Sequence, residues 1–480
     1  MKKIPSFIFG FYCLLSVSCS PESKSDTKEF SKEEVQVFIH VPGSYLNYAD
    51  LKENQRFVVS KRSLPYIQPR FHGQNIEDKV CFDDSYEKDE FKKSYENVDS
   101  CLKKFSETVK IDRIIVGPSE TLVMMGGHFR TKYSVQGLQK DYVERFVDKS
   151  VMKQYLITHD PGILTSRQLF IGTKEAGFSD EEMRSYVSSK FDPSVLKFIL
   201  KPTSDAGSSG IVVFENNPSF YPKLLEHIRS IKNKNEGEIS LVLEEFMEGK
   251  VLRMDGYINS QKMINLTSEY YVTPREFYQH GKPTKYTLVS DPHLREKYNE
   301  FTARVIKALD YKEGIFHLEA IEAHDGRLYF LEIAIRVGGN NVNGLIALGY
   351  SPRKAYIYSQ LGKELDFVID ESLHLDVISI FTPLVLAESD AIFYKINEFQ
   401  VDLDYLETYQ ENLSLLEQEG AKMRADERNL AELYFVSTDK KKLDQEVERV
   451  MNSLHVSLES RGGKYDGHIF KLDRHGWVLH

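Results

Sequence analysis

Two glutamates on opposite strands of a predicted hairpin are well suited to bind a metal ion. The segment Gly314–Gly339 contains two runs of strand-forming residues, separated by Asp325-Gly326. Asp-Gly between such runs predicts a two-residue type I′ turn, which places Glu319 directly opposite Glu332. Carboxylates in that arrangement repel each other. A divalent cation such as Mg²⁺ removes the repulsion because it accepts oxygen ligands from both.

Side chains of this hairpin alternate between an apolar and a polar face. The polar face carries His317, Glu319 and Glu332, with Arg336 further along the chain. The alternative to a metal site is a solvated face on which like charges are tolerated. We expect the other face to lie in the core, through Phe316, Leu318, Ala320, Tyr329, Leu331 and Ile333.

A Gly/Ser-rich loop follows a short apolar strand at residues 196–200 and begins next to Lys201. Such a loop offers backbone N–H groups to an anion, and a lysine at the end of a strand needs a charged partner. The loop lacks the Gly-Lys-Ser/Thr ending of a P-loop, and the alternative interpretation is an ordinary turn. We expect a nucleotide phosphate at Lys201 and at the loop residues Ser204, Gly207, Ser208, Ser209 and Gly210.

The segment Leu241–Gly249 is a short apolar strand that ends in two glutamates. Aliphatic side chains beside a backbone edge suit an adenine ring. The backbones of Glu245 and Met247 are the predicted contacts for the edge of that ring. An ordinary strand end is the alternative interpretation.

The order of these three segments resembles the ATP-grasp superfamily, specifically its carboxylate–amine ligase branch, to which L-amino acid ligases belong. The similarity extends from about Ile111 to Leu365. Residues 111–120 resemble the strand that closes the family's preceding α/β domain. Asp148-Lys149, followed by Met152-Lys153, resembles the motif that opens the nucleotide-binding region.

This resemblance implies that the chain binds ATP through particular residues. Lys149 and Lys201 would hold the α- and β-phosphates, and Glu244 would accept a hydrogen bond from the adenine amino group. The chain departs from the family pattern at Val251, where a glutamate that binds the ribose is common.

The resemblance also implies a metal ion and a catalytic arginine. Glu319 and Glu332 would hold Mg²⁺ (or Mn²⁺), and Arg336 would stabilise the transferred phosphoryl group. Ala334 stands where the family often has an asparagine that supplies a further metal contact.

The elements that position these residues predict a mixed α/β and α+β architecture, with an ATP-grasp fold implied by the resemblance. Residues 34–145 are expected to form a doubly wound pre-ATP-grasp domain. Its short strands lie at residues 35–39, 56–60 and 113–116 and end in turns where ligands bind in such sheets.

Residues 146–365 are expected to form the nucleotide-binding domain. A helix over Tyr142–Tyr155 would carry Lys149. Ser179, followed by Glu182, predicts the capped start of a helix over Asp180–Ser189, and apolar spacing predicts another over Asp291–Leu309.

Residues 366–480 are expected to form a C-terminal α+β cap. Strands are predicted at residues 377–381 and 433–436, and an amphipathic helix at residues 439–454.

The N-terminus resembles a bacterial lipoprotein signal. Residues 1–19 combine a basic start, an apolar stretch and Cys19, and a polar linker follows at residues 20–33. The alternative is an unprocessed hydrophobic tail. Membrane contact is expected only through this segment. It favours an anchored or exported protein, whereas ATP chemistry favours the cytoplasm. Cys81 and Cys101 would form one disulfide in an oxidising compartment or remain two thiols.

The predicted function is an ATP-dependent ligase that joins a small carboxylate to an amine, both of them potentially amino acids. An acyl phosphate would be the intermediate, and ADP and phosphate would be released. One alternative is a non-catalytic ATP-grasp-like binding module anchored at a membrane, and another is kinase-like phosphoryl transfer. The net charge of −10 provides no electrostatic basis for a nucleic-acid partner.

Overall fold

The protein is described here by a computed structural model. It covers residues 32–49, 54–71, 76, 78–88, 90–204, 210–234, 239–271, 284–339, 342–381, 391–396, 406–408, 421–423, 429–453, 455–460, 463–468, 471–473 and 476–478. The lipoprotein-like segment and the loop residues Gly207, Ser208 and Ser209 lie outside these ranges. Within them, no helix has the length and apolarity needed to cross a membrane.

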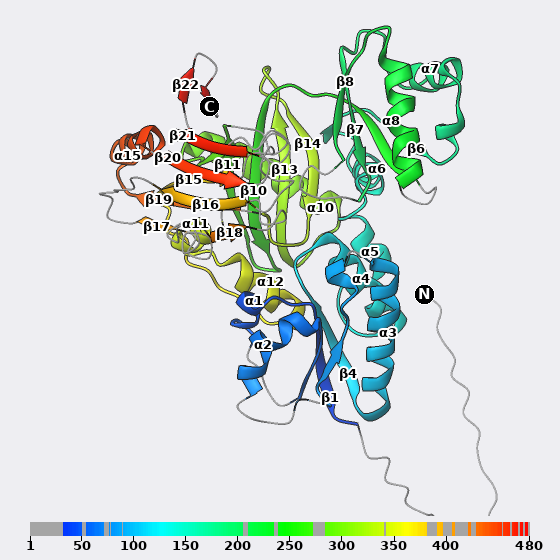
Figure 1. The fold of residues 1–480 in the computed structure, drawn as a ribbon, viewed down its shortest axis with the longest axis vertical. Helices are drawn as coiled ribbons and strands as arrows, with labels where there is room; N and C mark the ends of the chain where they lie inside the picture. The colour runs from blue at the N-terminus through cyan, green and yellow to red at the C-terminus, as the bar shows by residue number, and fades with distance from the viewer. Residues whose placement is uncertain are drawn as a thin grey trace, which may run out of the picture.

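The first domain contains a four-stranded parallel sheet in the order β3-β2-β1-β4. Helices α3 (Phe91–Thr108) and α4 (Glu120–Lys132) cover one face (Figure 1), and α12 (Pro352–Leu361) packs against the other. Strands buried on both faces need the continuous apolar runs that this segment contains. The predicted doubly wound domain is confirmed, with β3 as an additional strand. The strands are β1 (Glu34–Ile39), β2 (Gln55–Val59), β3 (Val80–Phe82) and β4 (Lys110–Val116).

A disulfide joins β3 to α3 in this domain. It links Cys81 to Cys101, whose Cα atoms lie 5.8 Å apart. Of the two alternatives left open by the sequence, the structure therefore has the disulfide.

A smaller antiparallel lobe contains the strands that flank the Gly/Ser-rich loop and the predicted adenine segment. Helices α7 (Asp180–Ser188) and α8 (Phe220–Lys234) pack on its sheet, which projects from the main body in Figure 1. Ser179 and Glu182 form the predicted capping box at the start of α7. The strand order is β6 (Gln168–Gly172), β9 (Ser240–Glu245), β7 (Lys197–Pro202) and β8 (Val212–Glu215).

The central sheet has nine strands in the order β17-β19-β15-β12-β11-β10-β13-β14-β5. Helices α6 (Lys149–His159) and α10 (Pro292–Ala308) pack against one face, so the long amphipathic helix predicted before the hairpin is confirmed as α10. Its strands, in chain order, are β5 (Leu164–Thr165), β10 (Lys250–Ile258), β11 (Met263–Tyr270), β12 (Thr284–Leu288), β13 (Gly314–Glu322), β14 (Leu328–Ala334), β15 (His374–Phe381), β17 (Leu406–Thr408) and β19 (Asn429–Ser437).

The C-terminal region contributes to this central sheet as well as forming structure of its own. Strand β15 pairs with β12, so the region predicted as a cap shares a sheet with the nucleotide-binding region. A second sheet has the order β18 (Ala421–Met423), β16 (Ala391–Ile396), β20 (His455–Ser460) and β21 (Gly463–His468). A two-stranded sheet of β22 (Lys471–Asp473) and β23 (Gly476–Val478) follows. Further helices are α1 (Gly43–Leu46), α2 (Leu64–Ile67), α5 (Lys140–Glu144), α11 (Val342–Ala347) and α15 (Lys440–Ser453).

The hairpin of β13 and β14 has the predicted pairing at the site but not the predicted turn. Glu319 lies opposite Glu332, as expected. Nearer the turn, the N–H of Ala323 bonds to the carbonyl oxygen of Arg327, so His324, Asp325 and Gly326 form the turn. The type I′ prediction is wrong because the turn is longer. A β-bulge next to Glu319 restores the predicted register beyond it.

The bulge also changes which residues enter the core. Ala320 pairs with Phe330, so Leu331 is the extra residue of β14. Phe330 is fully buried, whereas Tyr329 and Leu331, both predicted for the core, are only half-buried. The expected alternation fails there because the extra residue shifts the side chains by one position.

The helix predicted over Tyr142–Tyr155 is two helices, α5 and α6, which is a second correction. The side chain of Asp148 accepts hydrogen bonds from the N–H groups of Ser150 and Val151 and so caps α6. Lys149 is therefore the first residue of α6, where the backbone N–H groups also favour an anion.

Candidate functional site

The two predicted metal-binding glutamates lie side by side on the face of the central sheet opposite α6 and α10. Glu319 on β13 and Glu332 on β14 are directly paired, and the Glu332 side chain is 33% exposed. Two carboxylates at one point suit a hard cation that keeps several water ligands, as Mg²⁺ does. The residues therefore fit the metal that was predicted, although among the described residues no group of three or more candidate ligands surrounds a single point.

Positive charge gathers around this pair of glutamates. The Nζ of Lys149 lies 3.4 Å from Oε2 of Glu332. Burial acts to raise the pKa of Glu332, but Lys149, Lys201, His317 and Arg336 outweigh it and hold that pKa below its usual value. Glu332 is thus ionised at neutral pH, as a metal ligand must be.

Three buried residues, His317, Asp255 and Arg253, contact one another in series and lead to Glu319. His317 places Nε2 3.5 Å from Oε1 of Glu319, and its Nδ1 lies 2.9 Å from Oδ1 of Asp255. Asp255 in turn accepts a 2.5 Å hydrogen bond from Nε of Arg253. Burial opposes the protonation of His317, yet Asp255 raises its pKa above the usual value. These contacts fix the position of the histidine beside Glu319.

A second cluster lies at the base of the small lobe, where Lys153 and Glu244 are each only 1% exposed. The Nζ of Lys153 donates to Oε1 of Glu244 at 2.5 Å. The Nζ of Lys201 donates to Oε2 at 3.0 Å, and the hydroxyl of Ser166 donates to the same oxygen at 2.9 Å. Both carboxylate oxygens of Glu244 therefore already accept hydrogen bonds from the protein.

Burial and ion pairing oppose each other in this cluster, and the pKa values of both Glu244 and Lys153 end below their usual values. Burial acts to raise the pKa of Glu244, but Lys153 and Lys201 outweigh it and lower that pKa to about 2. For Lys153 burial is the stronger effect, and it lowers the pKa to about 8 despite the attraction of Glu244. The pair is thus ionic at neutral pH, with Lys153 still mostly protonated.

Arg336, the predicted catalytic arginine, connects the hairpin to the first domain. Its Nε donates to Oε1 of Glu120 at 2.5 Å, and Glu120 is the first residue of α4. Its side chain lies close enough to Glu332 to contribute to the lowered pKa of that residue. The arginine is therefore near the predicted metal pair and is held by a carboxylate of another domain.

The predicted adenine segment lies at the end of β9, and only the two ends of the predicted phosphate loop lie within the described residues. The N–H of Glu245 bonds to the carbonyl oxygen of Arg167, so it is already used within the sheet. Met247 is half-buried just beyond the end of β9. At the two ends of the loop, Ser204 is exposed and Gly210 has a positive φ of 65°.

The structure thus brings Lys149, Glu319, Glu332 and Arg336 together, and places Lys201 with Glu244 in the neighbouring cluster. Lys153 lies one helical turn after Lys149, and this spacing was the available signal for its role. Arg253 and Asp255 lie two residues apart in the buried strand β10, and charged residues at alternate positions of an apolar strand were the available signal for this pair. Sequence reasoning assigned no role to Lys153, Ser166, Arg253, Asp255, His317 or Glu120.

Residues 194–343 match the family model of the ATP-grasp domain. No curated protein matches the chain.

Several solved structures share the fold at low sequence identity. An L-amino acid ligase from Bacillus licheniformis has a TM-score of 0.58 and 13% identity, with 89% of this chain and 99% of that chain covered. The biotin carboxylase domain of a 2-oxoglutarate carboxylase from Hydrogenobacter thermophilus has a TM-score of 0.61 and 14% identity, with 90% of this chain and 91% of that chain covered. A carboxyaminoimidazole ribonucleotide synthase from Aspergillus clavatus has a TM-score of 0.58 and 12% identity, with 88% of this chain and 98% of that chain covered.

Proposed function

The chain contains an ATP-grasp domain and has the ATP-grasp fold, and from this premise we propose that it is an ATP-dependent ligase. It would activate a small carboxylate with ATP and join it to an amine. The observation that carries this proposal is the pairing of Glu319 with Glu332, with Lys149 and Arg336 beside them.

The first step would transfer the γ-phosphoryl group to the substrate carboxylate and release ADP. Glu319 and Glu332 would hold Mg²⁺ (or Mn²⁺), which when bound neutralises charge on the phosphates. Lys149 and Arg336 add positive charge where the phosphoryl group passes, and such electrostatic stabilisation is most of what phosphoryl transfer requires. An amine would then displace phosphate from the acyl phosphate and form an amide.

In the structure, the two lysines predicted to hold the α- and β-phosphates contact carboxylates. Lys149 lies beside Glu332, and Lys201 donates to Glu244. A bound nucleotide phosphate would replace these carboxylates as the negatively charged partner of the two lysines. Glu244 is only 1% exposed and both of its oxygens already accept hydrogen bonds from the protein, which favours a role in positioning Lys201 over the predicted hydrogen bond to adenine.

A membrane-anchored binding module without catalysis is the second candidate. The Cys81–Cys101 disulfide favours it, because structural disulfides persist mainly in oxidising compartments, where ATP is scarce. The same bond is compatible with a catalytic domain that binds ATP. The ligase should bind Mg-ATP, whereas an exported module without catalysis should not. Measured affinity for Mg-ATP therefore separates the two candidates.

The test is a screen for ADP release with pairs of amino acids, because L-amino acid ligase is among the structural neighbours. Release that requires both an acid and an amine supports the ligase. Hydroxylamine added with the acid should trap a hydroxamate if an acyl phosphate forms. AMP as the nucleotide product, a stable phosphoester without an amide, or no binding of Mg-ATP would contradict the proposal.

A further inference from the structure

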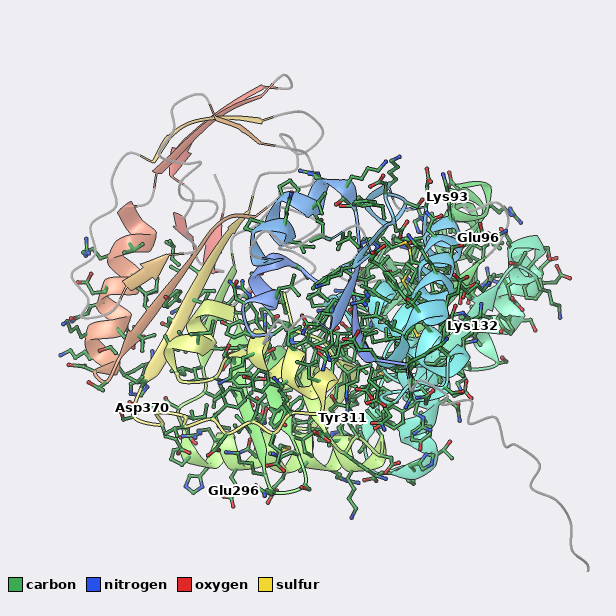
Figure 2. All side chains as sticks on the ribbon, turned by 90° about the horizontal axis from the view of Figure 1, so that it is seen from below. Lys93, Glu96, Lys132, Glu296, Tyr311 and Asp370 are labelled. Carbon is green, nitrogen blue, oxygen red and sulfur yellow. A yellow bond between two sulfur atoms is a disulfide. The ribbon has the colours of Figure 1, made fainter. Side chains whose placement is uncertain are left out.

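A cavity of about 260 Å³ lies between the first domain and the central body, apart from the paired glutamates. Strand β4 and helix α4 form one side, and α12 and the residues before β13 form the other. Tyr311, labelled in Figure 2, contributes to its wall. The volume is just below the range of about 300–1,000 Å³ of drug-sized ligand pockets, so it suits a smaller molecule.

A buried arginine without an acidic partner lines this cavity. Arg130 of α4 is 5% exposed, and burial lowers its pKa only to about 10, so it stays charged at neutral pH. Its Nε and Nη2 donate to the carbonyl oxygen of Ile114 at 3.0 and 2.7 Å, and Nη2 also donates to the side-chain oxygen of Gln360 at 2.9 Å. Nη1 has only a 3.4 Å contact with the carbonyl oxygen of Leu138.

All of these acceptors are neutral. In the part of the chain that the structure describes, no carboxylate lies within 4.0 Å of Arg130. A buried charge is usually paired, because its desolvation is otherwise uncompensated.

A second arginine lines the same cavity and reaches solvent. The side chain of Arg113 on β4 is 23% exposed, and its nearest acid, Asp112, lies at 3.8 Å. Its other contacts are a 3.3 Å hydrogen bond to Gln136 and a 3.5 Å contact with the carbonyl oxygen of Gln360. Among the described residues that line the cavity, Glu313 alone is acidic, and it is exposed. Positive charge therefore dominates the interior.

The remaining wall is largely apolar. Val123, Val143 and Ile335 line it and belong to the core of the central body. Ile335 is buried on this side, whereas the next residue, Arg336, pairs with Glu120. The cavity and the proposed phosphoryl site therefore lie on opposite sides of one chain segment.

We propose that this cavity is a second ligand site, which binds a small organic carboxylate with an apolar body. The carboxylate would be held by Arg113 and Arg130, because a charge-assisted hydrogen bond is stronger than a neutral one. The apolar body would pack against Val123, Val143 and Ile335. A purely structural role for Arg130, which fastens β4 to the loop at Leu138, needs no ligand and predicts no binding.

The experiment measures binding of sodium hexanoate to the purified chain by calorimetry at constant ionic strength. Hexylamine, with the same body and the opposite charge, is the matched ligand control. Arg113→Gln removes one cation, and Ser359→Leu fills the cavity while both arginines remain. Lys312→Gln is the matched protein control, because it removes a neighbouring charge whose side chain is 79% exposed.

Hexanoate should bind the wild type and Lys312→Gln equally, and hexylamine should bind neither. Arg113→Gln should weaken binding roughly tenfold, and Ser359→Leu should abolish it. Glu332→Gln should bind hexanoate as the wild type does, since it alters the other site. Absence of hexanoate binding, equal binding by hexylamine, or unchanged binding by Ser359→Leu or Arg113→Gln would overturn the proposal.

Discussion

The ionised pair of Lys153 and Glu244 is almost entirely removed from water, and each charge depends on the other. Single substitution leaves an uncompensated buried charge, which costs more than the net value of the pair. Lys201 and Ser166 still contact Glu244 when Lys153 is replaced, so part of the compensation remains.

Lys153→Met should therefore destabilise the protein by about 3 kcal/mol in urea unfolding. The double variant Lys153→Met with Glu244→Leu should recover part of that loss, because it removes both charges. Lys197→Met, a half-exposed lysine on the same sheet with only surface ion pairs, should cost less than about 1 kcal/mol. A single variant as stable as this control would show that the buried pair is not as strongly coupled as its geometry indicates.

Lowering the pH should reduce the free energy of unfolding through Glu244 over a defined pH range. Its pKa is lowered to about 2 in the folded protein, so the folded state binds this proton less tightly than the unfolded state. The contribution of Glu244 is fully present above its ordinary pKa of 4.5 and is lost as the pH falls toward 2. Unfolding free energies measured against pH should thus fall less steeply in Glu244→Gln than in the wild type over this range. Parallel curves would contradict the assignment.

Glu332→Gln should reduce ligase turnover roughly 10²–10³-fold, the cost of one lost electrostatic contact in an active site. The substitution loses favourable contacts with nearby positive groups, but the Glu332 side chain is 33% exposed and the amide keeps its shape, so folding should persist. The control is Glu296→Gln, an exposed position on α10 that Figure 2 labels at the outer surface. ADP release at several Mg²⁺ concentrations is the measurement. Wild-type turnover of Glu332→Gln at low Mg²⁺ would disprove the metal assignment.

At the scale of elements, the bulge in β14 decides on which face of the sheet the paired glutamates lie. An extra residue at Leu331 compensates for the longer turn, so that Glu319 and Glu332 remain opposite each other. Bulges commonly redirect side chains near functional sites, and this one lies directly beside the paired glutamates.

The disulfide between β3 and α3 should stabilise the first domain by about 3 kcal/mol, because it closes a loop with a sequence separation of 20 residues. Cys81→Ala with Cys101→Ala should lower the urea midpoint, and a reducing agent should lower that of the wild type by a similar amount. The reducing agent should leave the double variant unchanged. If it also leaves the wild type unchanged, the two cysteines are thiols in solution.

At the scale of the whole molecule, contacts between domains hold the proposed active site together. Arg336 reaches Glu120 of the first domain, and Lys153 on α6 reaches Glu244 of the small lobe. Figure 1 shows α6 between that lobe and the main body. The proposed phosphoryl site therefore draws on contacts from three parts of the chain.

Localisation can be tested on the intact chain by labelling with a palmitate analogue. The lipoprotein hypothesis expects label on the wild type and none on Cys19→Ala, because the thiol of Cys19 is the predicted acylation point. Cys13→Ala, at the other cysteine of the same segment, is the matched control and should keep the label. An unlabelled wild-type protein in the soluble cytosolic fraction would reject the hypothesis and favour ATP chemistry in the cell.

Much of the fold follows from local sequence patterns. Short apolar runs predicted β1, β2 and β4, and Ser179 with Glu182 predicted the start of α7. The Asp325-Gly326 turn predicted Glu319 opposite Glu332, but this pairing occurs only because the bulge at Leu331 compensates for the longer turn. The family resemblance supplied the order in which such segments form an ATP-grasp fold.

Contacts between distant segments were decided by the tertiary structure alone. Lys201 was predicted to bind a nucleotide phosphate, and in the structure its Nζ donates a hydrogen bond to Glu244 of the antiparallel partner strand. Nothing in the local pattern of α4 shows that Arg130 is buried against β4, or that Glu120 meets Arg336. The reason is that burial and pairing of a charge depend on segments far away in the sequence, whereas helices, strands and caps depend on residues close by.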